Sequence, residues 1–246
     1  MSNRFFLFAF LLIATSEILI QVFDLQEFNF ILKPLIVPSL SIFYFQNVGF
    51  KNRLFALALL FCWAGDVFLL FDHVNELYFM GGLGSFLVAH ILLFFLYGKL
   101  KHTKVEGLPA GQAGLNGPQR ARVSFPVILA GTGVITILYP SLGALKIPVI
   151  IYALALMLMV LQSIYRYGFT SAQSFWNVCI GALLFMLSDS LLAINKFFQP
   201  IANAGVLVIA TYMAALYFIV RGVIAHKGTK DQLNGSNGKV NSNSVY

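Results

Sequence analysis

The sequence predicts an all-α integral membrane protein, a bundle of about eight transmembrane helices. Of its 246 residues, 59% are hydrophobic and 10% are charged, whereas soluble domains carry roughly 45–50% apolar and about 25% charged residues. The apolar runs are continuous and reach the length of about 20 residues that a helix needs to cross a bilayer. They do not alternate with a period of two, so we expect helices rather than a closed barrel.

The first half of the chain contains four predicted spans. The first, Phe5–Phe23, begins after Arg4 like a signal peptide, with a basic start and a short apolar core. Its apolar run then continues to the length of a span, so we interpret it as a span rather than a cleaved signal. The next three spans are Phe30–Gln46, Arg53–Phe71 and Tyr78–Gly98.

The second half follows a polar stretch. Residues 99–122 are rich in glycine and basic residues, which is typical of a flexible loop. Residues 1–226 are therefore predicted to form one membrane domain. Residues 227–246, rich in Asn, Gly and Ser, have the composition of a disordered tail. The last four spans are Val123–Tyr139, Ile147–Tyr165, Phe175–Asn195 and Asn203–Val223.

The basic residues predict the orientation of the bundle. With the N-terminus inside, thirteen of the sixteen Lys and Arg residues fall on the cytoplasmic side, the exceptions being Lys33, Lys146 and Lys196. This bias is the one that the positive-inside rule expects, and it places both termini, the loop and the tail in the cytoplasm. Because these residues are scattered over loops, the net charge of +7 does not indicate a nucleic-acid partner.

Two aspartates interrupt the predicted spans. Asp66 lies in LFCWAGDVFLL, and Asp189 lies in FMLSDSLLAINKF. Each comes about 20 Å beyond the cytoplasmic start of its span, at about 1.5 Å per residue, and therefore in the outer half of the bilayer. Ionisable residues within spans are rare, costly and usually functional. We interpret the two aspartates as a functional pair, with a role in packing as the alternative.

Six further polar residues lie at this depth or toward the outer ends of the spans. Together with the aspartates they predict a polar cavity in the outer half of the bundle. They are Glu17, Lys33, His90, Asn195, Lys196 and Tyr212.

Each of these residues also has a structural explanation. Glu17 could pair with a neighbouring helix, and Tyr212 could form a hydrogen bond within the bundle. The two lysines could extend to the membrane interface, and Asn195 could end its helix. His90 is the one histidine of the group, and Cys62 and Cys179 lie inside spans, so we expect no metal site, cofactor or disulfide.

The aspartate pair allows two kinds of chemistry. Two carboxylates in a cavity of low dielectric constant cannot both ionise cheaply, so a protonated acid is expected beside a base. This arrangement suits hydrolysis by general acid–base catalysis. It also suits a proton-coupled transporter, and a lipid-binding protein without catalysis stays possible. No Gly-x-Ser-x-Gly or phosphate-loop motif occurs, which disfavours a serine hydrolase or an ATP-driven pump.

Five motifs follow one another along the chain. They are KPL at Lys33–Leu35, GDVFLL at Gly65–Leu70, GGLGSFLVAH at Gly81–His90, FMLSDSLLAINKF at Phe185–Phe197 and TYMAALY at Thr211–Tyr217. In this order they resemble the YhhN-type lysoplasmalogenase family, small multi-span hydrolases of alkenyl-ether lysolipids. The loop Thr103–Gln119 is longer than is usual in that family.

The resemblance implies hydrolysis of the vinyl-ether bond of lysoplasmalogen, a lysolipid taken from the surrounding membrane lipids. The products would be a fatty aldehyde and glycerophosphoethanolamine or glycerophosphocholine. Asp66 and Asp189 would then form the acid–base pair, in either order, and the two rim lysines would hold the phosphate. His90 and the neighbouring Asn195 and Tyr212 would position water or glycerol hydroxyls. Compact loops and short termini favour a bacterial inner membrane.

Overall fold

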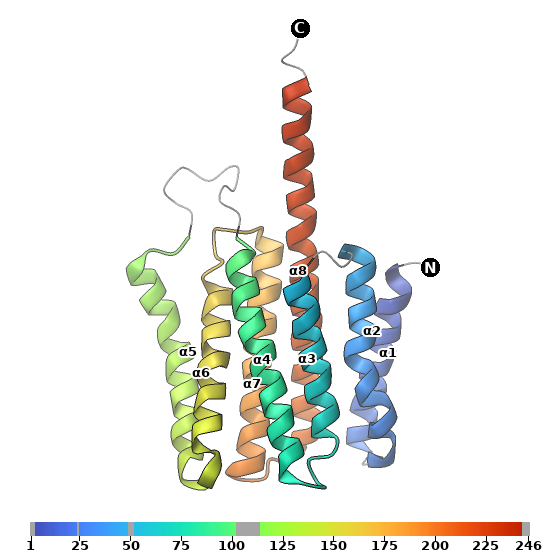
Figure 1. Ribbon diagram of the computed structural model, residues 1–246, viewed down its shortest axis with the longest axis vertical. Helices are drawn as coiled ribbons and strands as arrows, with labels where there is room; N and C mark the ends of the chain where they lie inside the picture. The colour runs from blue at the N-terminus through green and yellow to red at the C-terminus, as the bar shows by residue number, and fades with distance from the viewer. Residues whose placement is uncertain (1–2, 24, 49–51, 102–113, 243–246) are drawn as a thin grey trace.

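The computed structural model describes residues 3–23, 25–48, 52–101 and 114–242, and its main elements are eight α-helices. They stand side by side as a single bundle (Figure 1). Short 3-10 turns occupy Gln26–Phe28, Tyr139–Ser141 and Gly143–Leu145, and no strand occurs in these ranges. The helices are α1 (Asn3–Val22), α2 (Asn29–Val48), α3 (Arg53–Leu69), α4 (Glu76–Lys99), α5 (Gly117–Leu138), α6 (Lys146–Ile164), α7 (Ala172–Phe197) and α8 (Ala204–Ser242).

Each predicted span corresponds to one helix, which confirms the all-α membrane fold. Seven of the described helices are long and apolar enough to cross a membrane. The eighth, α3, has 17 residues and is about 25 Å long at 1.5 Å per residue. It packs along α4 within the same bundle (Figure 1).

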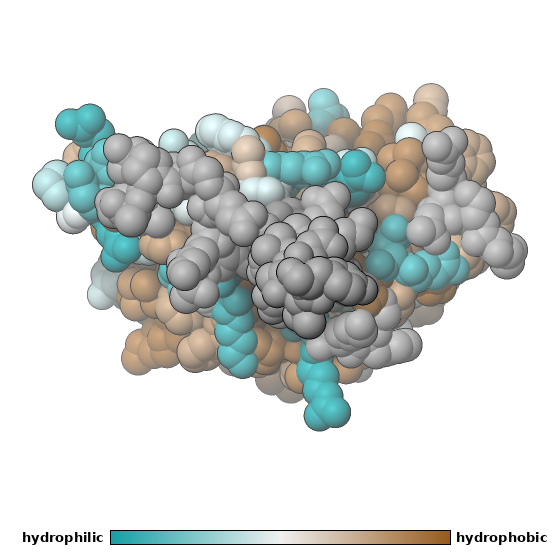
Figure 2. Space-filling model, turned by 90° about the horizontal axis from the view of Figure 1, so that it is seen from above, coloured by the Kyte–Doolittle hydropathy of each residue, from teal (hydrophilic) through white to brown (hydrophobic). Residues whose placement is uncertain are grey.

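Both ends of the chain lie at one end of the bundle. The N-terminal end of α1 and the projecting part of α8 lie at the same end (Figure 1), as an even number of crossings requires. Seen from this end, polar side chains gather on top while the flanks are apolar (Figure 2). Which side of a membrane this end faces stays a prediction from the basic residues.

The structure departs from the predicted loop 99–122 at its C-terminal end, because α5 begins at Gly117. Asn116 caps this helix. Its side-chain oxygen accepts from the backbone nitrogen of Gln119 at 2.9 Å, and the Gln119 side chain accepts from the backbone nitrogen of Asn116 at 3.0 Å. This reciprocal capping box, with Pro118 in the first turn, starts the helix within the predicted loop. Residues 102–113 of the loop lie outside the described ranges.

The structure also departs from the predicted tail, since α8 continues as a helix through Ser242 and projects beyond the bundle (Figure 1). Asn, Gly and Ser are weak helix formers, which is why the composition predicted disorder from residue 227. However, no proline interrupts residues 227–242, so nothing in this stretch forces the helix to stop. Residues 243–246 lie outside the described ranges.

A buried arginine joins three helices near the end that carries the termini. Arg166 is fully buried. Its Nε donates to the carbonyl oxygen of Leu100 at 3.2 Å, and its Nη2 donates to Ser174 Oγ at 2.7 Å. Ser174 Oγ in turn donates to the carbonyl oxygen of Gly222 at 2.8 Å. Burial lowers the pKa of Arg166 to about 10, so it stays charged at neutral pH and ties the ends of α4, α7 and α8 together.

Helices α7 and α8 approach so closely that a glycine is needed between them. A Cβ on Gly181 would lie 2.8 Å from the carbonyl oxygen of Ala215 and 2.9 Å from the backbone nitrogen of Ile219. Because backbone atoms cannot move aside as a flexible side chain can, this position accepts no larger residue without separating the helices. Small residues at helix contacts are how membrane helices pack tightly.

We therefore expect Gly181→Ala to lower the thermal unfolding midpoint of the purified protein in detergent, at a cost of about 1–3 kcal/mol for overpacking. Gly84→Ala in α4 is the matched control, because a Cβ there meets nothing within 4 Å. In the control, alanine gains roughly 0.5–1 kcal/mol of helix stability over glycine. Equal shifts in the two variants would contradict the close α7–α8 contact.

Candidate active site

Asp66 lies in the last turn of α3 and is 3% exposed. Its Oδ2 accepts a hydrogen bond from the hydroxyl of Tyr212 on α8 at 2.8 Å. The preceding Gly65 lets α4 come close, since a Cβ there would lie 2.6 Å from the ring of Phe86. The Phe86 ring also packs edge-on against Tyr212, with centroids 5.9 Å apart. The carboxylate is therefore held between α3, α4 and α8.

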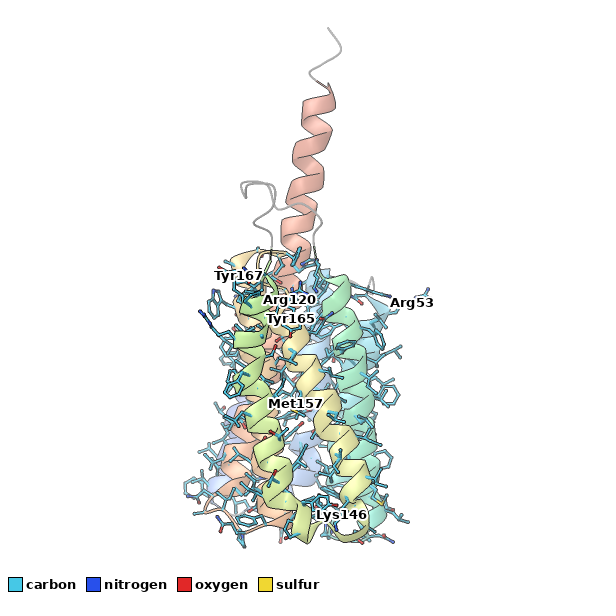
Figure 3. All side chains as sticks on the ribbon, turned by 90° about the vertical axis from the view of Figure 1, so that its left-hand side faces the viewer. Arg53, Arg120, Lys146, Met157, Tyr165 and Tyr167 are labelled. Atoms are coloured by element: carbon cyan, nitrogen blue, oxygen red, sulfur yellow. The ribbon has the colours of Figure 1, made fainter. Side chains whose placement is uncertain are left out.

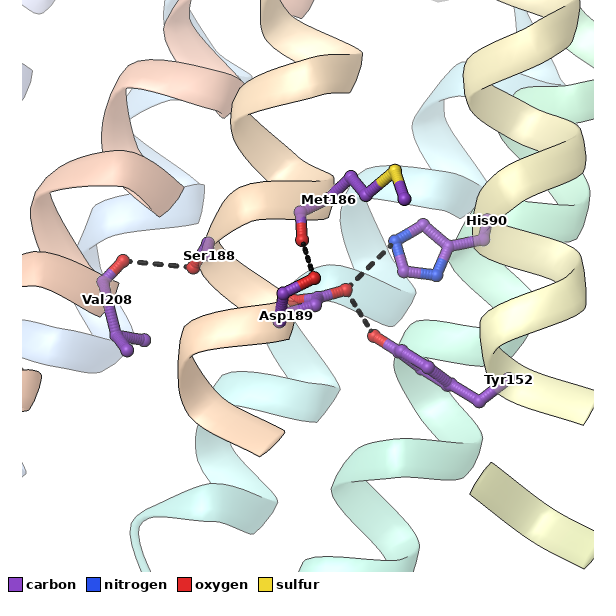
Figure 4. Close-up of polar contacts among 7 residues, drawn as sticks. His90, Tyr152, Met186, Ser188, Asp189 and Val208 are labelled. Carbon is purple, nitrogen blue, oxygen red and sulfur yellow. Dashed lines mark hydrogen bonds and ion pairs between the residues drawn. The ribbon is translucent and has the colours of Figure 1, made fainter. Parts of the chain in front are cut away.

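Asp189 lies about two turns before the C-terminal end of α7 and faces α4 and α6 (Figure 4). Its Oδ2 accepts a hydrogen bond from the hydroxyl of Tyr152 at 2.6 Å. His90 Nε2 lies 3.6 Å from the same oxygen, close enough for an ion pair when the imidazole is protonated but longer than a hydrogen bond. The fully buried His90 ring also packs edge-on against Tyr152 and Phe185.

The two aspartates line one cavity, which we call the polar cavity. It comprises about 680 Å³ of space, part of it open to the surroundings, between α1, α2, α3, α7 and α8, with Phe86 contributed by α4. The carboxylates repel each other across it, and Lys33 attracts Asp66. Its polar lining residues are Gln21, Lys33, Asp66, Ser188, Asp189, Asn195 and Tyr212.

A second cavity, which we call the apolar cavity, lies on the other side of Asp189. It comprises about 720 Å³ of space, part of it open to the surroundings, between α3, α4, α5, α6 and α7, and its lining is almost entirely aliphatic and aromatic. Leu69, Phe86, Asp189 and Leu192 line both cavities, whereas Asp66 lines only the polar one. Asp189 is thus the carboxylate that stands at the junction of the two cavities.

The structure places three of the six other predicted residues in the polar cavity, namely Lys33, Asn195 and Tyr212. Two more lie just behind it. His90 contacts Asp189 from α4, and Glu17 is fully buried in α1, where neither carboxylate oxygen has a hydrogen-bond partner among the described residues. Lys33 attracts Glu17 as well as Asp66.

Lys196 is not among the residues that line the polar cavity, and its predicted contact with the substrate stays a prediction. It follows Asp189 by about two helical turns, which puts it on the same face of the helix. Its long side chain instead reaches Asp72 in the α3–α4 connection, with Nζ 2.8 Å from Oδ2. The ammonium also lies over the ring of Phe79, 5.0 Å from its centroid. Both contacts hold it away from the cavity.

Sequence reasoning missed Tyr152, the hydrogen-bond donor to Asp189. A tyrosine is amphipathic and common in spans, so the motif IYALALM did not single it out. Its place one to two turns after the start of α6 at Lys146, close to the depth of Asp189, is the signal that was available. Ser188 was also missed, and its hydroxyl donates to the carbonyl oxygen of Val208 at 3.0 Å (Figure 4). Among the described residues, no three His, Cys, Asp or Glu side chains gather in an arrangement for a metal ion.

Fold and site together define a multi-pass membrane protein in which two aspartates within the bundle line a polar cavity, one of them shared with an apolar cavity. The sequence profile of the YhhN family matches residues 28–223, a range that includes both aspartates, so the chain belongs to the YhhN family. The lysoplasmalogenase TMEM86B of Sus scrofa is 32% identical over 189 residues, which cover 74% of this chain and 70% of that protein. No solved structure gives a significant match.

The role of Asn195 can be separated from that of the other lining residues. Its Oδ1 accepts from the backbone nitrogen of Ile201 at 2.9 Å and so shapes the α7–α8 turn. We expect Asn195→Ala to lose about 1 kcal/mol of stability, and Asn195→Asp, which keeps the acceptor, to retain most of it. Thermal unfolding of the two variants checks this, and equal midpoints would remove the turn-forming role.

Proposed function

We propose that this protein is a membrane hydrolase that cleaves the vinyl-ether bond of lysoplasmalogen. The products are a fatty aldehyde and glycerophosphoethanolamine or glycerophosphocholine. Membership of the YhhN family and the similarity to a protein named lysoplasmalogenase support this function. The observation that carries it is the position of Asp189, which borders both the polar and the apolar cavity.

A lysolipid consists of a polar headgroup, a glycerol unit and one hydrocarbon chain, and the vinyl ether lies where the chain begins. With the headgroup in the polar cavity and the chain in the apolar cavity, this bond lies at their junction. Lys33 is the cation that lines the polar cavity in the described structure, and it can pair with the phosphate. The arrangement therefore brings the reactive bond to Asp189.

Hydrolysis of a vinyl ether begins with protonation of its β-carbon, the alkene carbon farther from the ether oxygen. The carbon–carbon π electrons form the new C–H bond, and the α-carbon becomes part of an oxocarbenium ion. Water then adds to the α-carbon and loses a proton. The resulting hemiacetal breaks its bond to the glycerol oxygen, giving the aldehyde and a glycerol hydroxyl. The reaction thus needs an acid on the chain side and a base on the headgroup side.

The two aspartates differ in the cavities that they line, and this difference matches the two roles. Asp189 borders the apolar cavity, where the β-carbon lies, so we assign it as the acid that protonates carbon. Asp66 lines only the polar cavity, where water and the glycerol oxygen lie, so we assign it as the carboxylate that stabilises the cation and accepts the proton of water. Tyr152 and Tyr212 orient these groups through their hydrogen bonds, and His90 supports Asp189.

Both carboxylates are expected to be needed for cleavage. Asp189→Asn and Asp66→Asn each keep the size of the side chain but remove the proton transfer, so each should lower aldehyde release from lysoplasmalogen by roughly 100- to 10,000-fold. Asp72→Asn is the control, because Asp72 pairs with Lys196 at the end of the bundle. Aldehyde is measured with purified, folded protein, and near-normal release from both site variants would refute the assignment.

An ester lysolipid distinguishes this activity from that of a phospholipase. The intact protein should release aldehyde from lysoplasmalogen and little fatty acid from the ester substrate. Hydrolysis of the ester alone would reject the vinyl-ether function. If neither substrate is cleaved while protons drive uptake of a solute into vesicles, the protein is a transporter and the proposal fails.

Lys33 and Lys196 are expected to differ in their effect on substrate binding. Lys33→Ala should raise the KM for lysoplasmalogen about tenfold or more, because a charge-assisted hydrogen bond contributes about 1.5–3 kcal/mol. Its effect on kcat should be smaller. Lys196→Ala should leave KM nearly unchanged, since Lys196 lies outside the polar cavity. Initial rates over a range of substrate concentrations measure both, and the reverse order would place the phosphate at Lys196.

The type of membrane that holds the protein is also part of the proposal. Multiple apolar helices and family membership establish a multi-pass membrane protein. A bacterial inner membrane remains a proposal that rests on compact loops, and fractionation of the host's membranes tests it.

A further inference from the structure

The apolar cavity offers almost no free hydrogen-bonding groups to a bound molecule. The Ser190 hydroxyl donates to the carbonyl oxygen of Met186 at 2.7 Å, and the Tyr152 hydroxyl donates to Asp189. The rest of the lining is apolar apart from Asp189 itself. A buried polar group left without a partner is costly, so this cavity favours an occupant that is hydrocarbon along its length and polar only where it meets Asp189.

One end of the apolar cavity lies deep in the bundle. Along α6 its lining runs from Val149 to Met157, about 12 Å at 1.5 Å per residue. Along α5 it runs from Leu138 back to Gly131. Since α5 and α6 are joined by the short connection that follows Leu138, Gly131 and Met157 are the lining residues of these helices farthest from that connection. Met157 lies near mid-height between α5 and α6, with Lys146 at one end and Tyr165 toward the other (Figure 3).

Gly131 and Met157 are packed against each other at this inner end. Met157 is 5% exposed, and Gly131 is buried. A Cβ on Gly131 would overlap the sulfur of Met157 and lie 2.7 Å from its Cγ. The methionine side chain is flexible and can move, and the adjoining free space is the apolar cavity that it lines. A side chain at position 131 would therefore shorten the cavity by displacing Met157 into it.

We propose that Gly131 and Met157 set the length of hydrocarbon chain that the apolar cavity accepts. The proposal rests on the proposed function, because the chain is the tail of the same lysolipid whose headgroup occupies the polar cavity. The absence of a side chain at Gly131 leaves room for the far end of the chain, and Met157 forms the wall that the chain meets. The two residues thus determine specificity and take no part in proton transfer.

Binding of saturated alkyl-ether lysolipids tests the proposal without any cleavage, because these compounds lack the vinyl-ether double bond. Butyl, octyl and dodecyl compounds are titrated against purified protein, so that the shortest chain ends before Met157 and the longest reaches it. Gly131→Ala should weaken binding of the longest chain by roughly 4- to 15-fold, the effect of one or two methylenes losing their place in an apolar site. It should leave the shortest chain almost unaffected.

Three further variants sharpen the test. Met157→Ala removes the wall and should shift the preference toward longer chains. The double variant that combines Gly131→Ala with Met157→Ala should return toward the wild-type chain-length profile, since the two changes act on the same space. Gly133→Ala is the matched control in the same helix, because a Cβ there meets nothing within 4 Å, and it should leave the chain-length profile unchanged.

The outcomes separate the proposal from the proposed function. Equal weakening of all chain lengths by Gly131→Ala, or the same change in Gly133→Ala, would overturn the proposal. So would a Met157→Ala profile identical to wild type. If the intact protein releases no aldehyde but its binding depends on chain length as described, the cleavage reaction fails and the chain-length role stands. If aldehyde release is normal but Gly131→Ala and Met157→Ala both leave the chain-length profile unaltered, the chain-length role fails and the proposed function stands.

Discussion

The cost of keeping two carboxylates in a membrane bundle governs much of this structure. A carboxylate buried among apolar side chains is tolerated when hydrogen-bond donors and charges compensate for the water that it loses. Here a tyrosine donates to each one, Tyr212 to Asp66 and Tyr152 to Asp189. Because the donors come from α8 and α6, the aspartates on α3 and α7 can be accommodated only when these four helices are assembled. The polar groups of the site therefore also specify how the helices pair.

The wall between the two cavities depends on close contacts that carry no charge. Gly65 lets the ring of Phe86 lie against α3, and Phe86 contributes to the lining of both cavities together with Leu69 and Leu192. A larger residue before Asp66 would move this ring, and with it the boundary that leaves Asp189 accessible from both sides. The GD pair of the third span thus combines a polar group with the small residue that its surroundings require.

Hydropathy predicted the eight helices and the aspartates, because a carboxylate in a long apolar run is visible without any knowledge of packing. Depth along the predicted spans located Lys33 and Tyr212, which line the polar cavity. Tyr152 lies at a similar depth but is not singled out in this way, because a tyrosine in a span has many roles. A helical face likewise does not determine where a long side chain such as that of Lys196 reaches. The early start of α5 was visible as Asn116 and Gln119 in a capping box. The division into two cavities depends on contacts between helices far apart in the chain, and no local pattern encodes it.

The shared position of Asp189 also has a consequence for what happens after cleavage. The proposed reaction turns one amphipathic molecule into two products of opposite solubility, a long-chain aldehyde and a water-soluble phosphodiester. With an apolar cavity on one side of this carboxylate and a polar cavity on the other, the aldehyde chain and the phosphodiester would form in separate spaces. Their separation opposes the reverse reaction, because recombination needs both products at the same carboxylate.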